Sequence, residues 1–334
     1  MKSRSDVISL VRSKIRLMHL AYSTEDIYCG WIARYYDFCR GIGGELTHEQ
    51  KAEAFLTDLA VRKNVAARTQ NQAFSAMLFL YKEVLEEPLG KVDALRAKRA
   101  YHERTSPSRE QILLFREAVE DTESTPVRLL VDLLYGCGLR VSEPLDLRVK
   151  DVLWSEGPNG QLLLRVAKGG KDRRVPLPRS CVAPLRRQIE RSKALWDGDR
   201  ANAPDVGVTL PFALERKYPQ APFHWQWFWV FPAQNHCVDP RGGRRVRFHL
   251  LVDCIQRGVQ RAATKVGLGG FVTPHVLRHA YATHSRESMD SLRQLLGHSS
   301  LETTATYLHP VVDHAGNPLD DLLENRASAP RKPG

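Results

Sequence analysis

No run of 18 apolar residues occurs anywhere in the 334-residue sequence, so a membrane-spanning helix is not expected. Residues 1–6 also lack the apolar stretch that marks a secretory signal peptide. From these two absences the sequence predicts a cytoplasmic protein with no membrane partner.

Cysteine is scarce and is not grouped for metal binding. The six cysteines are Cys29, Cys39, Cys137, Cys181, Cys237 and Cys254. None pairs with another at the short spacing of a zinc site, so reduced thiols that mostly fill the core are expected. The sequence also has no Walker-type phosphate loop and no paired carboxylates at a two-metal spacing. We therefore expect no metal and no other cofactor.

Positive charge is in excess. Lysine and arginine total 49 against 38 acidic residues, which gives a net charge of +11. Such a surplus favours a polyanionic partner, although charge alone also fits any basic soluble protein. The length exceeds that of one typical domain, so two domains are expected.

Residues 1–87 have the apolar spacing of four short helices. Thr24 is the expected N-cap of the second helix, and Thr47 that of the third. Residues 88–107 break this pattern with proline, glycine, serine and several basic side chains. They are expected to form a basic linker, which either follows a phosphate backbone or is simply solvated.

From residue 108 the pattern is that of a mainly α fold with a small antiparallel β-sheet (α+β). Ser108 and Gln111 form a capping box at the start of a helix. Further expected helices are 126–137 and 179–196, and the expected strands are 152–154, 162–166 and 173–177. A glycine-rich hairpin turn that contains Lys168 joins the last two strands.

A histidine and an arginine lie three residues apart at a predicted helix start. Thr273 is a good N-cap and Pro274 suits the first helical position, which places His275 in the first turn. Arg278 then lies on the same face. The positive end of the helix should keep His275 able to accept a proton. Alone, such a pair is a weak signal, because most histidine–arginine pairs at this spacing lie on the surface and have no function.

A second histidine and a tyrosine follow. Gly297 is a natural helix C-cap directly before His298, and Ser299 with Glu302 forms a capping box for a next helix. Tyr307 falls near the end of that helix, where a tyrosine usually only packs. Earlier in the chain, Arg140 lies in a turn after two glycines.

The non-catalytic interpretation of Arg140 is that it forms an ordinary salt bridge on the surface. Glu143, three residues on, could hold it in place. A lysine at a hairpin tip, such as Lys168, is ordinarily exposed to solvent and has no catalytic function. It is the conjunction of all these residues, rather than any one of them, that favours a function in phosphate chemistry.

In order and context these residues resemble the tyrosine recombinase family. The segments that carry the resemblance are 138–143, 168–171, 275–279, 296–298 and Tyr307. The resemblance implies a DNA-binding core-binding domain at 1–87, a linker at 88–107 and a catalytic domain at 108–312, which together form a C-shaped clamp on DNA. It implies the catalytic residues Arg140, Lys168, His275, Arg278, His298 and Tyr307, a covalent phosphotyrosine intermediate without metal, and a homo-tetramer on DNA. The tail, 313–334, would pack on a neighbouring protomer or be disordered.

An additional segment at about 196–236 narrows the resemblance to integron integrases. Trp225, Trp227 and Trp229 fall within five residues there. Exposed indoles can stack on unpaired bases, which suits a folded single-stranded cassette site beside a duplex attachment site. We expect one or two of these indoles to face DNA, and the alternative is an aromatic mini-core. Nearby Arg241, Arg244, Arg245 and Arg247 are expected to contact phosphates.

Two departures accompany this resemblance. Phe248-His249 stands where integron integrases often have two histidines, and the segment from His284 to Leu292 is shorter than expected. The alternatives are therefore a Xer-type or phage-type recombinase that acts on duplex sites, and a relative that binds DNA but has lost catalysis.

Overall fold

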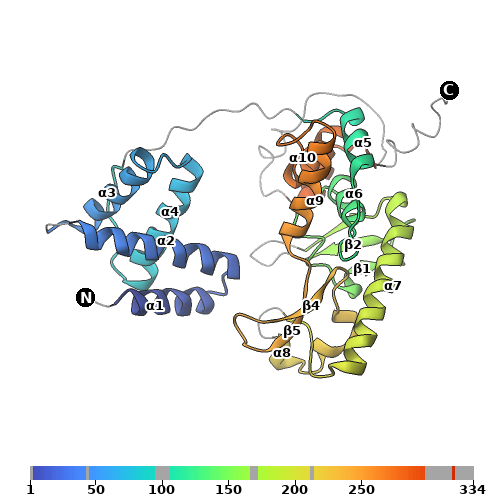
Figure 1. The fold of residues 1–334 in the computed structure, drawn as a ribbon, viewed down its shortest axis with the longest axis horizontal. Coiled ribbons are helices and arrows are strands. Elements are labelled where there is room, and N and C mark those ends of the chain that lie inside the picture. Colours follow the sequence, from blue (N-terminus) through green and yellow to red (C-terminus); the bar gives the residue numbers. More distant parts are fainter. Residues whose placement is uncertain are drawn as a thin grey trace. The chain divides into compact units, whose positions relative to one another are not determined.

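The computed structural model describes residues 3–42, 45–94, 106–165, 172–210, 214–297 and 318–319. The chain divides into two compact units, Met1–Arg104 and Thr105–Gly334. Both are mainly helical, and the second also carries short strands (Figure 1). Among the described helices, none is both long and apolar enough to cross a membrane.

The described residues of the first unit form four α-helices, as predicted. They are α1 (Arg4–Leu17), α2 (Tyr22–Gly41), α3 (His48–Val61) and α4 (Ala67–Phe79), and a π-helical turn at Leu80–Val84 extends the last one. Thr47 caps α3 in a capping box with Gln50, as predicted. The cap predicted for α2 is wrong. Ala21 takes the extended N-cap conformation, and the Thr24 amide already donates to the Ala21 carbonyl inside the first turn.

The core of the first unit forms where the apolar faces of these helices meet. Val11, Ile15, Leu56 and Met77 are completely buried there. Polar groups are stable in such a core when they are paired with each other. The Tyr35 and Tyr81 hydroxyls meet this condition, since they hydrogen-bond to each other at 2.8 Å.

The first half of the second unit contains helices α5 (Arg109–Ala118), α6 (Val127–Gly136) and α7 (Arg179–Asn202), with strands β1 (Val152–Leu153), β2 (Gln161–Leu164) and β3 (Arg173–Pro176). Ser108 and Gln111 cap α5 as predicted. The strands form one antiparallel sheet in the order β1-β2-β3, with Leu164 opposite Arg173. The predicted α+β class is confirmed, and α7 continues beyond the predicted end at 196.

The second half of this unit contains α8 (Leu214–Lys217), α9 (Val252–Lys265), α10 (Pro274–His284) and α11 (Met289–Leu296). Strands β4 (Pro232–Val238) and β5 (Arg245–His249) pair as an antiparallel ribbon. Short 3-10 turns lie at Val149–Asp151, Ala221–Phe223 and Trp225–Trp227.

Helix α6 is the centre of the second core. It is buried at every position except Arg128, and it packs against α7, α9 and α10 (Figure 1). Its last residue, Gly136, is so closely covered that a Cβ there would lie 2.8 Å from Pro178 and 3.1 Å from Leu319. Leu319, from the C-terminal segment, is thus buried in the core of its own chain. Packing of the remaining tail on a neighbouring protomer stays a prediction, because the rest of it lies outside the described residues.

Candidate active site

Helix α10 begins as the sequence predicts. The Thr273 hydroxyl accepts a hydrogen bond from the Val276 amide at 3.3 Å, and Pro274 occupies the first position of the helix. His275 lies exposed in the first turn, with its ring edge-on to that of His279 at a centroid distance of 4.1 Å. The structure therefore presents this histidine to solvent at a positive helix end.

Arg278, one turn along the same helix, is 5% exposed. Its Nη1 donates to the Gly138 carbonyl at 2.7 Å, and its Nη2 donates to the Leu296 carbonyl at 2.6 Å. This guanidinium therefore joins three elements: α10, the turn after α6, and the end of α11. Gly138 has a φ of +61°, which is a left-handed conformation that favours glycine.

Arg140 lies in the turn after α6 and is held by Glu143, as predicted. The Arg140 amide donates to Glu143 Oε2 at 2.7 Å, and its Nη1 donates to Oε1 at 2.8 Å. Nη2 lies 3.4 Å from the Gly297 carbonyl. The Arg140 side chain is nevertheless 46% exposed, so this oriented cation is open to a ligand from solvent.

A third arginine, Arg173 of β3, completes this group and is not among the predicted site residues. Its Nη2 donates to Glu143 Oε2 at 2.7 Å and its Nε to the Leu295 carbonyl at 2.7 Å. Arg278 Nη1 lies 3.9 Å from the same carboxylate oxygen. No sequence signal separates Arg173 from its neighbour Arg174, since both are arginines at the start of one strand.

One carboxylate thus faces three guanidinium groups. Burial by itself would raise the pKa of Glu143, but the hydrogen bonds from Arg173 and from Arg140 outweigh it and lower this pKa. Glu143 is therefore ionised at neutral pH, and these four side chains carry two positive charges in excess. Such a site suits the negative charge of a phosphodiester.

The remaining predicted site residues, Lys168, His298 and Tyr307, lie outside the described residues, although the structure describes the backbone that leads to two of them. Leu164 and Arg173 pair across the hairpin that bears Lys168. Gly297 ends α11 in the left-handed conformation, at φ +63°, as predicted for the C-cap before His298.

The tryptophan-rich insert is anchored by Arg148. This buried guanidinium donates to the carbonyls of Trp227 and Thr209, and its Cζ lies 3.9 Å from the ring centroid of Trp229. Trp229 is 4% exposed, and its indole donates to the Arg247 carbonyl at 3.0 Å. Trp229 therefore fills a small core that closes the insert, which is the alternative given for these indoles, and it is not one of the one or two expected to face DNA.

Trp225 and Trp227 are half-buried in the same cluster, against Trp196 and Phe228. Each residue is partly exposed, and each has a lysine nearby. Lys150 Nζ lies 2.7 Å from the centroid of the Trp227 ring, and Lys193 Nζ lies 5.9 Å from that of Trp225. A half-buried indole beside a cation can still offer an edge or part of a face to a ligand.

Of the basic run after the insert, Arg247 does not fit the predicted phosphate contact. It is 4% exposed, and its Nε donates to Asp199 Oδ2 at 2.6 Å, while His236 Nε2 lies 2.9 Å from Asp199 Oδ1. Arg247 therefore holds β5 to α7. Arg241, Arg244 and Arg245 are exposed, as a contact with phosphates requires.

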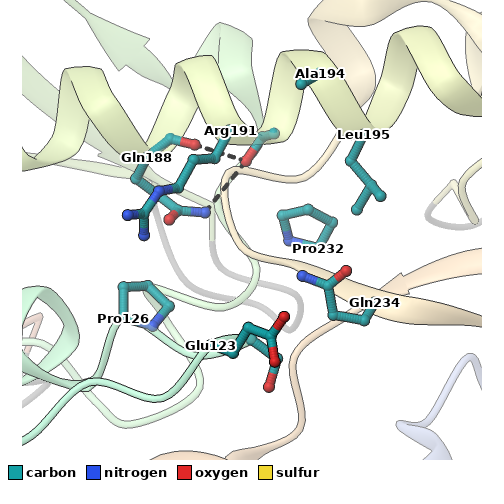
Figure 2. A pocket seen from close by; sticks show the side chains of 10 residues that line it. Glu123, Pro126, Gln188, Arg191, Ala194, Leu195, Pro232 and Gln234 are labelled. Atoms are coloured by element: carbon teal, nitrogen blue, oxygen red, sulfur yellow. Dashed lines mark hydrogen bonds between the residues drawn. The ribbon is translucent and has the colours of Figure 1, made fainter.

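The cavity in Figure 2 is separate from the arginine group. It has a volume of about 350 Å³ and lies between α7, the turn before α6 and the start of β4. Gln188 Nε2 and Ser192 Oγ on its wall hydrogen-bond to each other and to the Val230 carbonyl, so these two donors serve the fold. We assign it no part in the chemistry.

A helical unit followed by a unit with a cationic arginine group fits an enzyme that acts on a phosphodiester, and comparison with known proteins identifies the class as one that cuts and rejoins DNA. Two family models cover these units: "Phage integrase, N-terminal SAM-like domain" matches residues 8–91, and "Phage integrase family" matches residues 107–314. The chain belongs to the phage integrase family, and it is a site-specific tyrosine recombinase.

Individual relatives support this assignment. An "Integrase/recombinase" from Escherichia coli is 38% identical over 95% of this chain and 94% of the relative. A "Tyrosine recombinase XerD" from Agrobacterium fabrum is 32% identical over 83% of this chain and 81% of the relative. Among solved structures, a Tn1549 transposon integrase in complex with transposon right end DNA matches with a TM-score of 0.59 at 16% identity. The match covers 97% of this chain and 99% of the integrase chain. This last likeness concerns the fold alone.

Proposed function

We propose that this recombinase is of the integron integrase type and inserts and excises gene cassettes. The observation that carries the proposal is the insert between α7 and β4, with half-buried Trp225 and Trp227 beside lysines. Partly accessible indoles next to cations are suited to stack on extrahelical bases of a folded single strand.

In the proposed reaction, Arg140 and Arg278 bind the non-bridging oxygens of the scissile phosphate. His298 adds a hydrogen bond to the same oxygens. Together they stabilise the charge that develops in the transition state. Arg140 is the more accessible of the two arginines, at 46% against 6% side-chain exposure, so we expect it to meet the phosphate first.

Strand cleavage is a transfer of the phosphoryl group from DNA to tyrosine. The Tyr307 hydroxyl attacks phosphorus, forms a 3′-phosphotyrosyl bond and gives its proton to His275. The bond to the 5′-oxygen breaks, and Lys168 protonates that oxygen. A free 5′-hydroxyl of a partner strand then reverses these steps, so the phosphodiester energy is kept without ATP or metal.

Four active sites are needed to exchange two pairs of strands, and we therefore propose a homo-tetramer on DNA. In it, residues 1–87 and 108–312 would clamp the duplex, the linker at 88–107 would follow the backbone, and the tail at 313–334 would pack on a neighbour. The partners are a duplex attachment site and a folded single-stranded cassette site. We also propose that this reaction takes place in the cytoplasm.

Two DNA forms of one cassette site test the integron assignment. The protein is incubated with the folded bottom strand and, separately, with the same site as a plain duplex, and covalent adducts are measured on denaturing gels. We expect cleavage of the folded strand and little of the duplex. Equal cleavage of both forms would instead favour the Xer-type or phage-type alternative.

A nicked suicide substrate tests catalysis itself. The missing strand segment traps the covalent intermediate, so wild type should accumulate adduct and Tyr307→Phe should not. If wild type forms no more adduct than Tyr307→Phe, the chain is a DNA-binding relative without activity.

A further inference from the structure

We propose that Arg173 is a positioning residue for strand cleavage. It fixes the end of α11 and the carboxylate of Glu143 relative to β3, so that Arg140 and Arg278 present their side chains to one phosphate. This inference rests on the reaction proposed above, in which Arg140 and Arg278 bind that phosphate.

Arg173 bridges two elements far apart in sequence. Nε donates to the Leu295 carbonyl at the end of α11, and Nη2 donates to Glu143 Oε2 in the turn after α6, both at 2.7 Å. The side chain is only 9% exposed. A charge so deeply buried is stable only with paired acceptors in good geometry, so the two contacts fix each other.

The C-terminus of α11 shows how the three arginines act together. Three successive carbonyls accept from three different arginines: Leu295 from Arg173, Leu296 from Arg278, and Gly297 from Arg140. The negative end of a helix dipole and its unpaired carbonyls attract cations. The last turn before His298 is therefore held by the same groups that are proposed to bind the phosphate.

Arg173 also acts on Arg140 through a shared oxygen. Glu143 Oε2 accepts from both Arg173 Nη2 and the Arg140 amide, while Oε1 accepts from Arg140 Nη1. Loss of Arg173 would leave this carboxylate held mainly by its two hydrogen bonds from Arg140, without a fixed connection to β3. The orientation of the exposed Arg140 guanidinium would then be less well defined.

The close packing at Gly297 is consistent with this role. Gly297 lies next to the Arg173 side chain, since a Cβ at Gly297 would lie 3.2 Å from Arg173 Nη1 and 3.3 Å from its Cδ. The guanidinium thus occupies the space behind the helix end, away from solvent. We therefore describe Arg173 as a positioning residue and not as a phosphate ligand.

The test compares two substitutions at this position with a matched control. Arg173→Gln removes the charge, whereas Arg173→Lys keeps the charge but cannot reach both acceptors. The control is Arg174→Gln, the adjacent residue of β3, whose side chain is 57% exposed and pairs with Glu156. Each full-length variant is assayed for DNA affinity by gel shift, thermal unfolding, and single-turnover adduct formation at saturating suicide substrate.

For Arg173→Gln we expect cleavage to slow about 100-fold, as misplacement of a phosphate-binding group by about 1 Å can do. DNA affinity should change less than about threefold, because phosphate contacts across the whole site dominate binding. Arg173→Lys should recover part of the rate, and Arg174→Gln should match wild type. In a double variant with Glu143→Gln, the loss should be smaller than the product of the two single losses, because part of each residue's effect passes through their shared contact.

The outcomes separate this inference from the reaction on which it rests. Absence of adduct with wild type would overturn the reaction and this inference together. An active wild type with an equally active Arg173→Gln would overturn this inference alone. So would a loss of rate that matches the loss of folded protein and of DNA affinity, since Arg173 would then be merely structural.

Discussion

Replacement of Gly138 by alanine places a methyl group where the turn before Arg140 has no room for one. The added Cβ would lie 2.4 Å from Tyr281 Cδ1 and 2.9 Å from Leu296 Cδ2. Contacts this short require a backbone or side-chain shift. The Gly138 carbonyl accepts from buried Arg278, so any shift is transmitted to the candidate active site.

Two costs add up in this variant. A non-glycine residue at a left-handed φ costs about 1–2 kcal/mol. Overpacking of a filled core costs a further ~1–3 kcal/mol. We therefore expect the free energy of unfolding to fall by about 2–5 kcal/mol, a large part of the ~5–15 kcal/mol of a typical domain.

The matched control is Gly267→Ala. Gly267 has a similar φ of +73°, but a Cβ at this position would have no other atom within 4 Å, so only the conformational cost of about 1–2 kcal/mol applies. Urea unfolding followed by tryptophan fluorescence measures both, because five of the six tryptophans lie in the second unit. If Gly138→Ala destabilises no more than Gly267→Ala, the steric argument is wrong.

Three further perturbations test other parts of the second unit. Arg247→Met should destabilise the second unit by about 3–5 kcal/mol, because buried Asp199 loses its guanidinium partner. The control is Arg245→Gln, at the exposed end of β5, which should change stability by less than ~0.5 kcal/mol in the same urea experiment. Burial lowers the pKa of His284 from 6.5 to about 4, so only the unfolded chain takes up the proton between these values. Stability should then be full above pH 6.5 and fall as the pH drops towards 4, and His284→Gln should show a smaller fall in denaturation curves at each pH. Trp227→Ala should reduce adduct formation on the folded strand about tenfold, because one stacking contact with a base is lost. Adduct formation on a duplex attachment site should fall less, and equal losses on the two substrates would argue against base stacking.

Much of the local structure follows from the sequence because its signals are local. Thr47, Ser108 and Thr273 cap helices as predicted, and Gly297 ends one. Thr24 shows the limit of such signals, since a good capping residue can equally lie one turn inside a helix whose start is set by packing. The strands beside the Lys168 hairpin were likewise predictable from their period of two.

The contacts of the candidate site were only partly predictable. Glu143 lies three residues from Arg140, and this short separation made their pairing visible in sequence. The contact of Arg173 with Leu295 spans 122 positions and depends on how β3 meets α11. Burial of Arg247 could not be predicted for the same reason, because it depends on the packing of β5 against α7 and not on composition.

The hold of Glu143 on Arg140 also has a consequence for the thermodynamics of DNA binding. A free arginine side chain has about 2 kcal/mol of rotamer entropy to lose when it is immobilised. Arg140 has already lost much of this freedom to Glu143, and the longest of its three contacts, at 3.4 Å to the Gly297 carbonyl, is the one most easily exchanged for a phosphate oxygen. Much of the entropic cost of ordering this cation is therefore met during folding, so that DNA binding requires little more than the exchange of one long hydrogen bond for a contact with phosphate.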